Sequence, residues 1–306
     1  MSAPAYVASD AALLAVAEAI AGDWERVGAR GHFLARNLET GEQLGFDVET
    51  PVPLASVAKF PVALAVLERV AAGAIDPARQ LTIAPGTSIG PTGIAAFRYP
   101  VTVAVGDLVF LMLSISDNAA GDALLDLVGL DELGRSLAAW DCPGVRLRHR
   151  LQRLYECAVG VAGEDFGLAL ELAIRDDQSG NHTIETLDPA HANVGTAAAL
   201  VDLLGKVWLD EIASPPATAE LRRLMSLQVF TQRLSSDLRT DTVRVSGKTG
   251  TFLHLRHEIG VVEADSGDRV AIAALTRSTR RASLAADIDL AIGTAARSAF
   301  EALRTV

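Results

Sequence analysis

Residues 242–276 read TVRVSGKTGTFLHLRHEIGVVEADSGDRVAIAALT, and their pattern predicts most of one β-sheet. The stretch holds three β-rich runs, at Thr242–Val245, Glu258–Glu263 and Arg269–Thr276. Asp265-Ser266-Gly267 predicts a tight turn between the last two runs. Because strands joined by such short turns pair antiparallel, we expect an antiparallel sheet at this end of the chain.

The N-terminal region supplies the rest of the predicted sheet. Gly31–Asn37 and Gln43–Asp47 flank a turn at Thr40-Gly41 and indicate a hairpin. An amphipathic helix over about Ala11–Ala21 precedes them, and a helix over about Ala285–Leu303 closes the chain. We therefore expect an α/β sandwich, in which the two ends of the chain form one five-stranded antiparallel sheet flanked by the terminal helices.

The middle of the chain has mostly helical patterns. These lie at Phe60–Val70, Val105–Ser114, Ala119–Leu127 and Arg148–Arg175, and at Val194–Val207 with Asn193 as its expected cap. The sequence thus predicts two domains. Residues 1–50 and 215–306 form a discontinuous α/β domain, and residues 51–214 form an all-helical domain. A cleft between the two lobes is the natural place for a binding site.

Composition narrows the function classes. Apolar residues make up 50% of the 306 residues, enough for a substantial core, and acidic residues outnumber basic ones 38 to 27. The resulting net charge of -11 argues against nucleic acid or an anionic membrane surface as a partner. No apolar run approaches the ~20 residues of a membrane span. The N-terminus lacks the basic head of a signal peptide, so we expect a cytoplasmic protein. Its oligomeric state stays open.

The sequence predicts no metal and no cofactor. Two cysteines, Cys142 and Cys157, are too few for a disulfide framework and indicate reduced thiols. His254 and His257 are three residues apart, and on a strand that spacing places them on opposite faces, which disfavours a metal pair. Neither G-x-G-x-x-G nor a phosphate-binding G-x-x-x-x-G-K-[ST] occurs, so nucleotide binding has no support.

Three short motifs carry the candidate chemistry. In Ser56-Val57-Ala58-Lys59, helical spacing places the serine and the lysine on one face, about 5–6 Å apart between Cβ atoms. A serine hydroxyl needs a nearby base to act as a nucleophile, and a lysine with a lowered pKa can be that base. Ser116-Asp117-Asn118 stands between two helical patterns, and Lys248-Thr249-Gly250 ends the strand that begins near Thr242. Taken singly, these motifs indicate only a helix start, a helix cap and a strand that ends in a turn.

Together and in this order, the S-x-x-K, S-D-N and K-T-G motifs resemble those of class A β-lactamases and penicillin-binding proteins. The resemblance extends from about Gly31 to Ala299 and implies the β-lactamase/transpeptidase fold. It also implies a covalent acyl-enzyme at Ser56. Lys59 would accept the serine proton, and Ser116 and Lys248 would complete the relay.

The same resemblance implies how a substrate binds. The backbone N–H groups of Ser56 and Thr251 would hold the oxyanion, and the Asn118 amide would hold a substrate carbonyl. Lys248 and Thr249 would attract a substrate carboxylate, while Gly250 lets the ligand approach the backbone closely. His257 or Arg256 at the Thr251 edge of the cleft could also meet that carboxylate. The partner expected is a carboxylate-bearing small molecule.

One element of the class A pattern is absent. Those enzymes carry a glutamate in an E-x-x-L-N loop that activates the water for deacylation, and no such pattern occurs between Trp140 and Asn193. The candidate replacements there are Glu156, Glu164, Asp165 and Glu171. We therefore expect a serine hydrolase acting on a β-lactam or a small ester or amide, with weak β-lactamase activity. A cytoplasmic acyltransferase and a non-catalytic binding protein of the same fold stay open.

Overall fold

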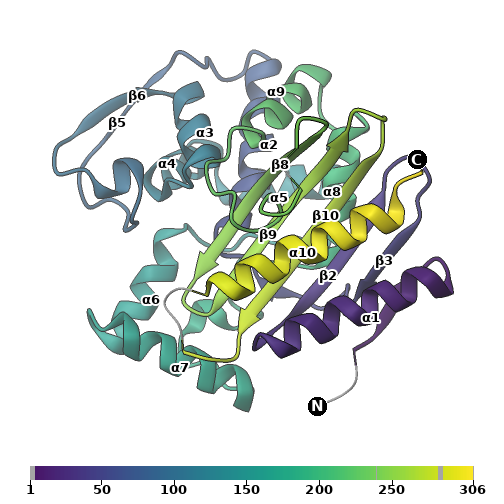
Figure 1. Ribbon diagram of the computed structural model, residues 1–306. Helices are drawn as coiled ribbons and strands as arrows, with labels where there is room; N and C mark the ends of the chain where they lie inside the picture. The colour runs from purple at the N-terminus through teal and green to yellow at the C-terminus, as the bar shows by residue number, and fades with distance from the viewer. Residues whose placement is uncertain (1–3, 239, 282–284, 306) are drawn as a thin grey trace.

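The computed structural model describes residues 4–238, 240–281 and 285–305. These residues form a six-stranded antiparallel sheet with helices on both faces (Figure 1). In spatial order the strands are β1 (Tyr6–Ala8), β3 (Gln43–Phe46), β2 (Ala29–Asn37), β10 (Arg269–Ser278), β9 (Leu255–Ala264) and β8 (Val243–Phe252). The first and last parts of the chain thus share one sheet, because β2 pairs with β10 in the centre.

The terminal helices α1 (Ala11–Arg26) and α10 (Ala286–Leu303) cover one face of the sheet, and they lie side by side in Figure 1. The Asp10 side chain caps α1 by accepting a hydrogen bond from Leu13 N at 2.8 Å. On its sheet-facing side, Trp24 packs edge-on against Phe33 with ring centroids 5.7 Å apart. The burial of this apolar layer holds the sheet between the helices.

The other face of the sheet packs against a helical lobe. Its helices are α2 (Lys59–Ala71), α3 (Val105–Ser114), α4 (Asn118–Val128), α5 (Leu130–Ala139), α6 (Gln152–Ala162), α7 (Phe166–Ser179), α8 (Ala197–Trp208) and α9 (Pro215–Met225). Short 3-10 turns are η1 (Ala55–Ala58), η2 (Gly93–Ala96) and η3 (Glu185–Leu187). Helix α2 is buried along its entire stretch from Lys59 to Leu67 and forms the centre of this lobe.

The predicted fold class is confirmed, and the sheet has one strand more than expected. The additional strand, β1, has three residues, too few to show a β pattern in the sequence, and it pairs with β3. Gly163, with a positive φ of 60°, ends α6, so the helical pattern over 148–175 divides into two helices.

The expected cap at Asn193 is wrong. Helix α8 begins at Ala197, and the Thr196 side chain caps it by accepting from Ala199 N. The Asn193 side-chain oxygen Oδ1 accepts instead from Arg148 N at 2.7 Å, so this residue ties two loops together.

The block 51–214, expected to be all helical, also contains two short two-stranded sheets. These pair β4 (Val52–Pro53) with β7 (Val194–Gly195), and β5 (Gln80–Ile83) with β6 (Val101–Ala104). Helix α9, assigned to the other domain by the boundary at residue 215, packs against α2 of the helical lobe.

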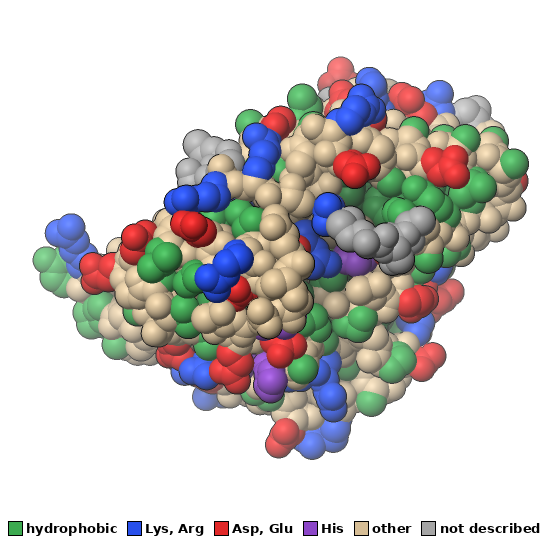
Figure 2. All heavy atoms as spheres, turned by 90° about the horizontal axis from the view of Figure 1, so that it is seen from below, with side chains coloured by type: hydrophobic (Ala, Val, Ile, Leu, Met, Phe, Trp, Pro, Cys, Tyr) green, Lys and Arg blue, Asp and Glu red, His purple; other side chains and the backbone are tan. Residues whose placement is uncertain are grey.

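Within the described residues, no helix combines the length and apolar character needed to cross a bilayer. Both cysteines are free, with Cys142 buried and Cys157 half-buried. Figure 2 views the molecule from below and shows basic and acidic side chains interspersed on that face.

Candidate active site

The first motif lies where η1 meets α2. Ser56 stands in the 3-10 turn, and Lys59 is the first residue of α2. Ala55, just before the serine, has a positive φ of 46°. Because this conformation disfavours a residue with a Cβ, the surrounding structure must hold the turn in place. The turn brings Lys59 Nζ to 3.2 Å from Ser56 Oγ.

Ser116 stands between two amines. Its Oγ is 3.1 Å from Lys59 Nζ and 3.0 Å from Lys248 Nζ. The Asp117 carboxylate caps α4 by accepting from Ala119 N at 2.9 Å, which fixes the turn that carries Ser116. The S-D-N motif is therefore both a helix cap and part of the candidate site.

The two lysines are fully buried, and burial lowers the pKa of each. The pKa of Lys59 falls to about 7, while the charges of Asp117 and Asp122 partly oppose the effect of burial. The pKa of Lys248 lies well below its usual value because of burial and because of the positive charge of Lys59. At neutral pH a large share of Lys59 is thus a neutral amine, the form that can accept a proton.

Strand β8 carries the third motif in its middle. The expectation that Lys248-Thr249-Gly250 ends the strand is wrong, since β8 continues to Phe252. A Cβ on Gly250 would lie 2.8 Å from the carbonyl oxygen of Leu54, closer than real Cβ atoms approach. Glycine at this position thus lets the turn that carries Ser56 pack directly on the strand.

These elements enclose a cleft of about 390 Å³. Its wall consists of Ser56, Pro91, Thr92, Ser116, Asn118, Tyr155, Phe230, Gln232, Arg233, Thr249, Thr251, Arg256, Ala285 and Asp289. Five of the predicted site residues are thus on the wall, and Lys59 and Lys248 reach it through their contacts with Ser56 and Ser116. The cleft has the size expected for a small-molecule site.

Asn118 is partly used by the protein itself. Its Oδ1 accepts from Lys59 Nζ at 2.7 Å, and its Nδ2 donates to the Ile89 carbonyl at 2.7 Å. Because an amide nitrogen carries two hydrogens, the second one is shared with the Tyr155 hydroxyl on the cleft wall, and a substrate carbonyl would have to displace Tyr155 from it.

His257 does not face the cleft, which corrects the expectation that it meets a substrate carboxylate. The ring is 1% exposed, and its Nε2 lies 2.9 Å from the Pro53 carbonyl. Since a carbonyl only accepts, Nε2 carries the hydrogen. Burial lowers the pKa of His257 to about 3. The neutral ring therefore anchors the segment that leads to Ser56, and Arg256, the other candidate, lines the cleft instead.

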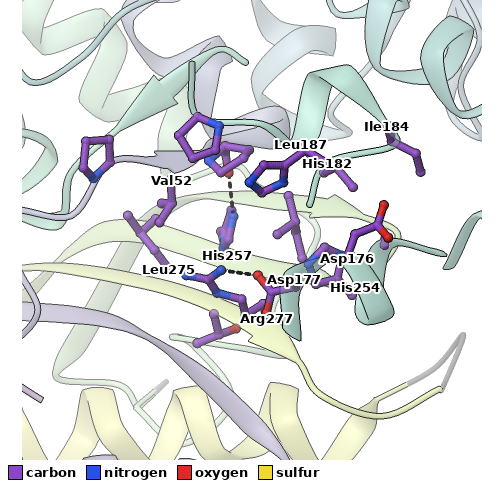
Figure 3. Close-up of a pocket in the computed structure, with 16 residues that line it drawn as sticks. Val52, Asp176, Asp177, His182, Ile184, Leu187, His254, His257, Leu275 and Arg277 are labelled. Atoms are coloured by element: carbon purple, nitrogen blue, oxygen red, sulfur yellow. Dashed lines mark hydrogen bonds and ion pairs between the residues drawn. The ribbon is translucent and has the colours of Figure 1, made fainter. Parts of the chain in front are cut away.

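Figure 3 shows where the two histidines lie. His254 belongs to the turn between β8 and β9, not to a strand, and it lines the same small cavity as His257, of about 40 Å³. Asp177 from α7 points toward Arg277 from β10 across this cavity, and the two are paired. The expectation of opposite strand faces is thus wrong, yet the described residues contain no group of three metal-ligating side chains.

Arg233 is a cleft residue that the motifs did not indicate. Its side chain is 2% exposed and donates to the Thr251 hydroxyl at 2.7 Å and to the His257 carbonyl at 2.7 Å. Its Nε donates to Asp289 at 2.7 Å. A lone arginine in a polar loop carries no sequence signal, because the contacts that recruit it come from strands and from α10.

None of the four acids considered as replacements lines the cleft. Glu156 lies near Arg153 and Glu171 pairs with Arg281, all with exposed side chains, while Glu164 and Asp165 are exposed residues between α6 and α7. Asp289 is the one carboxylate among the described residues on the cleft wall, and Arg233 holds it.

An apolar side chain lies next to Lys59. Leu151 is 4% exposed, and a Cβ built on Gly121 would lie 2.7 Å from its Cδ1 and 3.2 Å from Lys59 Cε. The Asp122 carboxylate fixes this loop by accepting from the backbone N–H groups of Leu151 at 2.6 Å and Gln152 at 3.0 Å. Leu151 and the Lys59 side chain therefore both pack closely against Gly121.

Sequence comparison finds relatives over nearly the whole chain. A family model described as "Beta-lactamase enzyme family" matches residues 15–303. A protein named "Beta-lactamase regulatory protein BlaB", from Streptomyces cacaoi, is 42% identical over 267 residues, covering 82% of this chain and 85% of its own.

Solved structures show the same fold. A β-lactamase from Sphaerobacter thermophilus superposes with a TM-score of 0.76 at 21% identity, covering 94% of this chain and 96% of its own. A PBP-A mutant, solved as an acyl-enzyme complex with penicillin G, superposes with a TM-score of 0.74 at 19% identity, covering 95% and 97% of the two chains.

Proposed function

Because the chain belongs to the β-lactamase enzyme family, we propose that it forms an acyl-enzyme at Ser56 with a β-lactam or a small ester or amide. The observation that carries this proposal is the contact of 3.2 Å between Lys59 Nζ and Ser56 Oγ, at a cleft wall. A nucleophile within hydrogen-bond reach of a base with a suitable pKa is the arrangement that covalent catalysis requires.

The proposed acylation begins at the serine hydroxyl. Ser56 Oγ attacks the substrate carbonyl carbon while neutral Lys59 takes the hydroxyl proton. The oxyanion is held by the backbone N–H groups of Ser56 and Thr251. The amide C–N bond, or the ester C–O bond, then breaks. Its leaving atom receives a proton through Ser116, which lies 3.0 Å from the second amine, Lys248.

Charge complementarity supports a substrate with a carboxylate. Arg233 presents positive charge near the Thr249–Thr251 part of the cleft, and it donates to Thr251 Oγ1 at 2.7 Å. Carboxylates accept well from a guanidinium N–H and from hydroxyl groups such as that of Thr249. The only described carboxylate on the wall, Asp289, is paired with Arg233.

Release of the acyl group should be slow. Hydrolysis of the ester needs a base that activates water, and no carboxylate of the described cleft wall is free of a cationic partner. The chain would therefore hold a β-lactam as a long-lived ester and show weak β-lactamase activity.

One finding favours a second candidate. The relative from Streptomyces cacaoi is named a regulatory protein, and a protein that retains a β-lactam without turning it over suits ligand sensing. For this second candidate, a non-catalytic regulatory protein, the ligand binds without a covalent bond, and Ser56 is dispensable for binding.

Intact-mass spectrometry tests the proposal. After exposure to penicillin G, the wild type should gain the full mass of the drug, because opening the lactam ring releases no leaving group. Ser56→Ala should gain nothing, and p-nitrophenyl esters should acylate the same residue. Equal ligand binding by the wild type and Ser56→Ala, with no adduct in either, would instead support the regulatory candidate. Faster adduct loss on adding amines or alcohols, with a transferred product, would identify an acyltransferase.

A further inference from the structure

Glu258 is a buried acid that the acylation chemistry does not use. It lies on β9, directly opposite Thr249 of β8, and has no exposed surface. A Cβ on Gly247 would lie 2.8 Å from its Oε1, so glycine on the neighbouring strand makes room for the carboxyl group. A buried carboxyl group is costly unless its oxygens find donors.

Both oxygens of Glu258 have donors. Oε2 accepts from Leu234 N at 2.8 Å, and Oε1 accepts from Gln228 Nε2 at 2.7 Å. Because each oxygen receives a hydrogen, the ionised carboxylate is the form that fits these contacts.

Gln228 extends the chain of hydrogen bonds to the cleft. Its Oε1 accepts from Thr249 N at 2.6 Å and from Thr249 Oγ1 at 3.1 Å. Its orientation is fixed at both ends, since the backbone N–H needs an acceptor and the Glu258 carboxylate needs a donor. Without the Glu258 carboxylate, Gln228 Nε2 would lose its acceptor, and that side of the Gln228 amide would no longer have a fixed orientation.

The hydrogen bonds from Glu258 through Gln228 end at Thr249, a proposed substrate-binding residue. Thr249 lines the cleft, and its hydroxyl hydrogen can rotate from Gln228 to a substrate carboxylate while its N–H keeps the amide oxygen occupied. We infer that Glu258 is a positioning residue, which holds Thr249 through Gln228 in the orientation that receives the carboxylate of the substrate. This inference rests on the proposed acyl-enzyme function and specifies how its carboxylate site is kept in shape.

Glu258→Gln tests the chain of contacts. A glutamine presents one oxygen and one NH₂ group, so either Leu234 N or Gln228 loses its acceptor. We expect amide hydrogen exchange at Thr249, resolved by NMR, to become about tenfold faster, and acylation by penicillin G to become about tenfold less efficient. Acylation by a neutral p-nitrophenyl ester should change little. The control is Glu263→Gln, the same substitution on the same strand.

A swap separates positioning from packing. Gln228→Glu alone should accelerate Thr249 exchange, because it places two carboxylates together. In the double variant Gln228→Glu/Glu258→Gln, the amide at position 258 donates to the carboxylate at position 228, which again accepts from Thr249. Restored exchange protection in the double variant supports the inference.

Unchanged Thr249 exchange and unchanged acylation in Glu258→Gln would overturn the inference, as would failure of the swap to restore protection. Equal losses for penicillin and the neutral ester would also overturn it, since they would indicate a general structural role. If penicillin fails to acylate the wild type, the proposed function is wrong, and the exchange measurement still decides whether Glu258 positions Thr249.

Discussion

Acylation of Ser56 should accelerate as the pH rises through about 7, the pKa to which burial lowers Lys59. Lys59 accepts the serine proton only as a neutral amine, so the rate should follow the neutral fraction. For that pKa the neutral fraction is about 3% at pH 5.5 and about 97% at pH 8.5. The predicted rate difference between these two conditions is therefore about 30-fold.

Stopped-flow fluorescence with a labelled penicillin, with the protein in excess, measures this acylation step. Burial also raises the pKa of Glu258 to about 7, so the same series is run on Glu258→Gln. That variant should be slower yet should keep the rise with pH, because Lys59 is unchanged. A rate that is flat or falls between pH 5.5 and 8.5 would refute the assignment of Lys59 as the base. If the acylation rate of Glu258→Gln does not rise with pH, the group whose titration controls the rate is Glu258 and not Lys59.

Three substitutions test the framework of the site. Gly250→Ala should destabilise the fold by about 1–3 kcal/mol in urea unfolding and slow acylation, because its Cβ would meet the Leu54 carbonyl at 2.8 Å; wild-type stability would contradict the packing described. Arg233→Lys should reduce acylation by penicillin about tenfold, because one amine cannot replace the guanidinium donors to Thr251, His257 and Asp289; unchanged acylation would show that these contacts do not shape the cleft. Asp122→Ala should lower the free energy of unfolding by about 2–3 kcal/mol, since it removes the acceptor for Leu151 N at 2.6 Å; no change in unfolding would show that the loop has other supports.

The sequence predicts the fold class because its strong patterns are local. The helix at Val105–Ser114 agrees with the structure at both ends, as its apolar spacing follows one helical face. The β-rich sequence of the first run stops at Val245 because residues 246–250 are polar or glycine, whereas strand β8 continues to Phe252. Pairing with β9 supplies the β structure there, and such tertiary pairing leaves no local signal.

The motif residues of the site could be predicted, and the groups that support them could not. Ser56, Lys59, Ser116 and Lys248 converge as their spacing and resemblance indicate. His257 was placed on the wrong side because the position of the β8–β9 turn was not known, and a shift of one residue reverses the face of every side chain on a strand.

Arg233 and Glu258 differ from the motif residues, because each acts through contacts with partners distant in the sequence. Arg233 meets the His257 carbonyl, 24 residues away, and Glu258 meets Leu234 N over the same separation. Neither residue type is unusual in its local sequence, so only the folded arrangement reveals a role. The absence of the loop glutamate, in contrast, could be inferred from the sequence, because its E-x-x-L-N pattern is local.

A crystal structure of the protein soaked in penicillin G would examine the covalent chemistry most directly. We predict continuous electron density from Ser56 Oγ to the opened lactam carbonyl, with the carbonyl oxygen bonded to the backbone N–H groups of Ser56 and Thr251. The drug carboxylate should face Thr249 and Arg233. A penicillin with a closed ring and no bond to Ser56, or a covalent bond to any other side chain, would contradict the proposal.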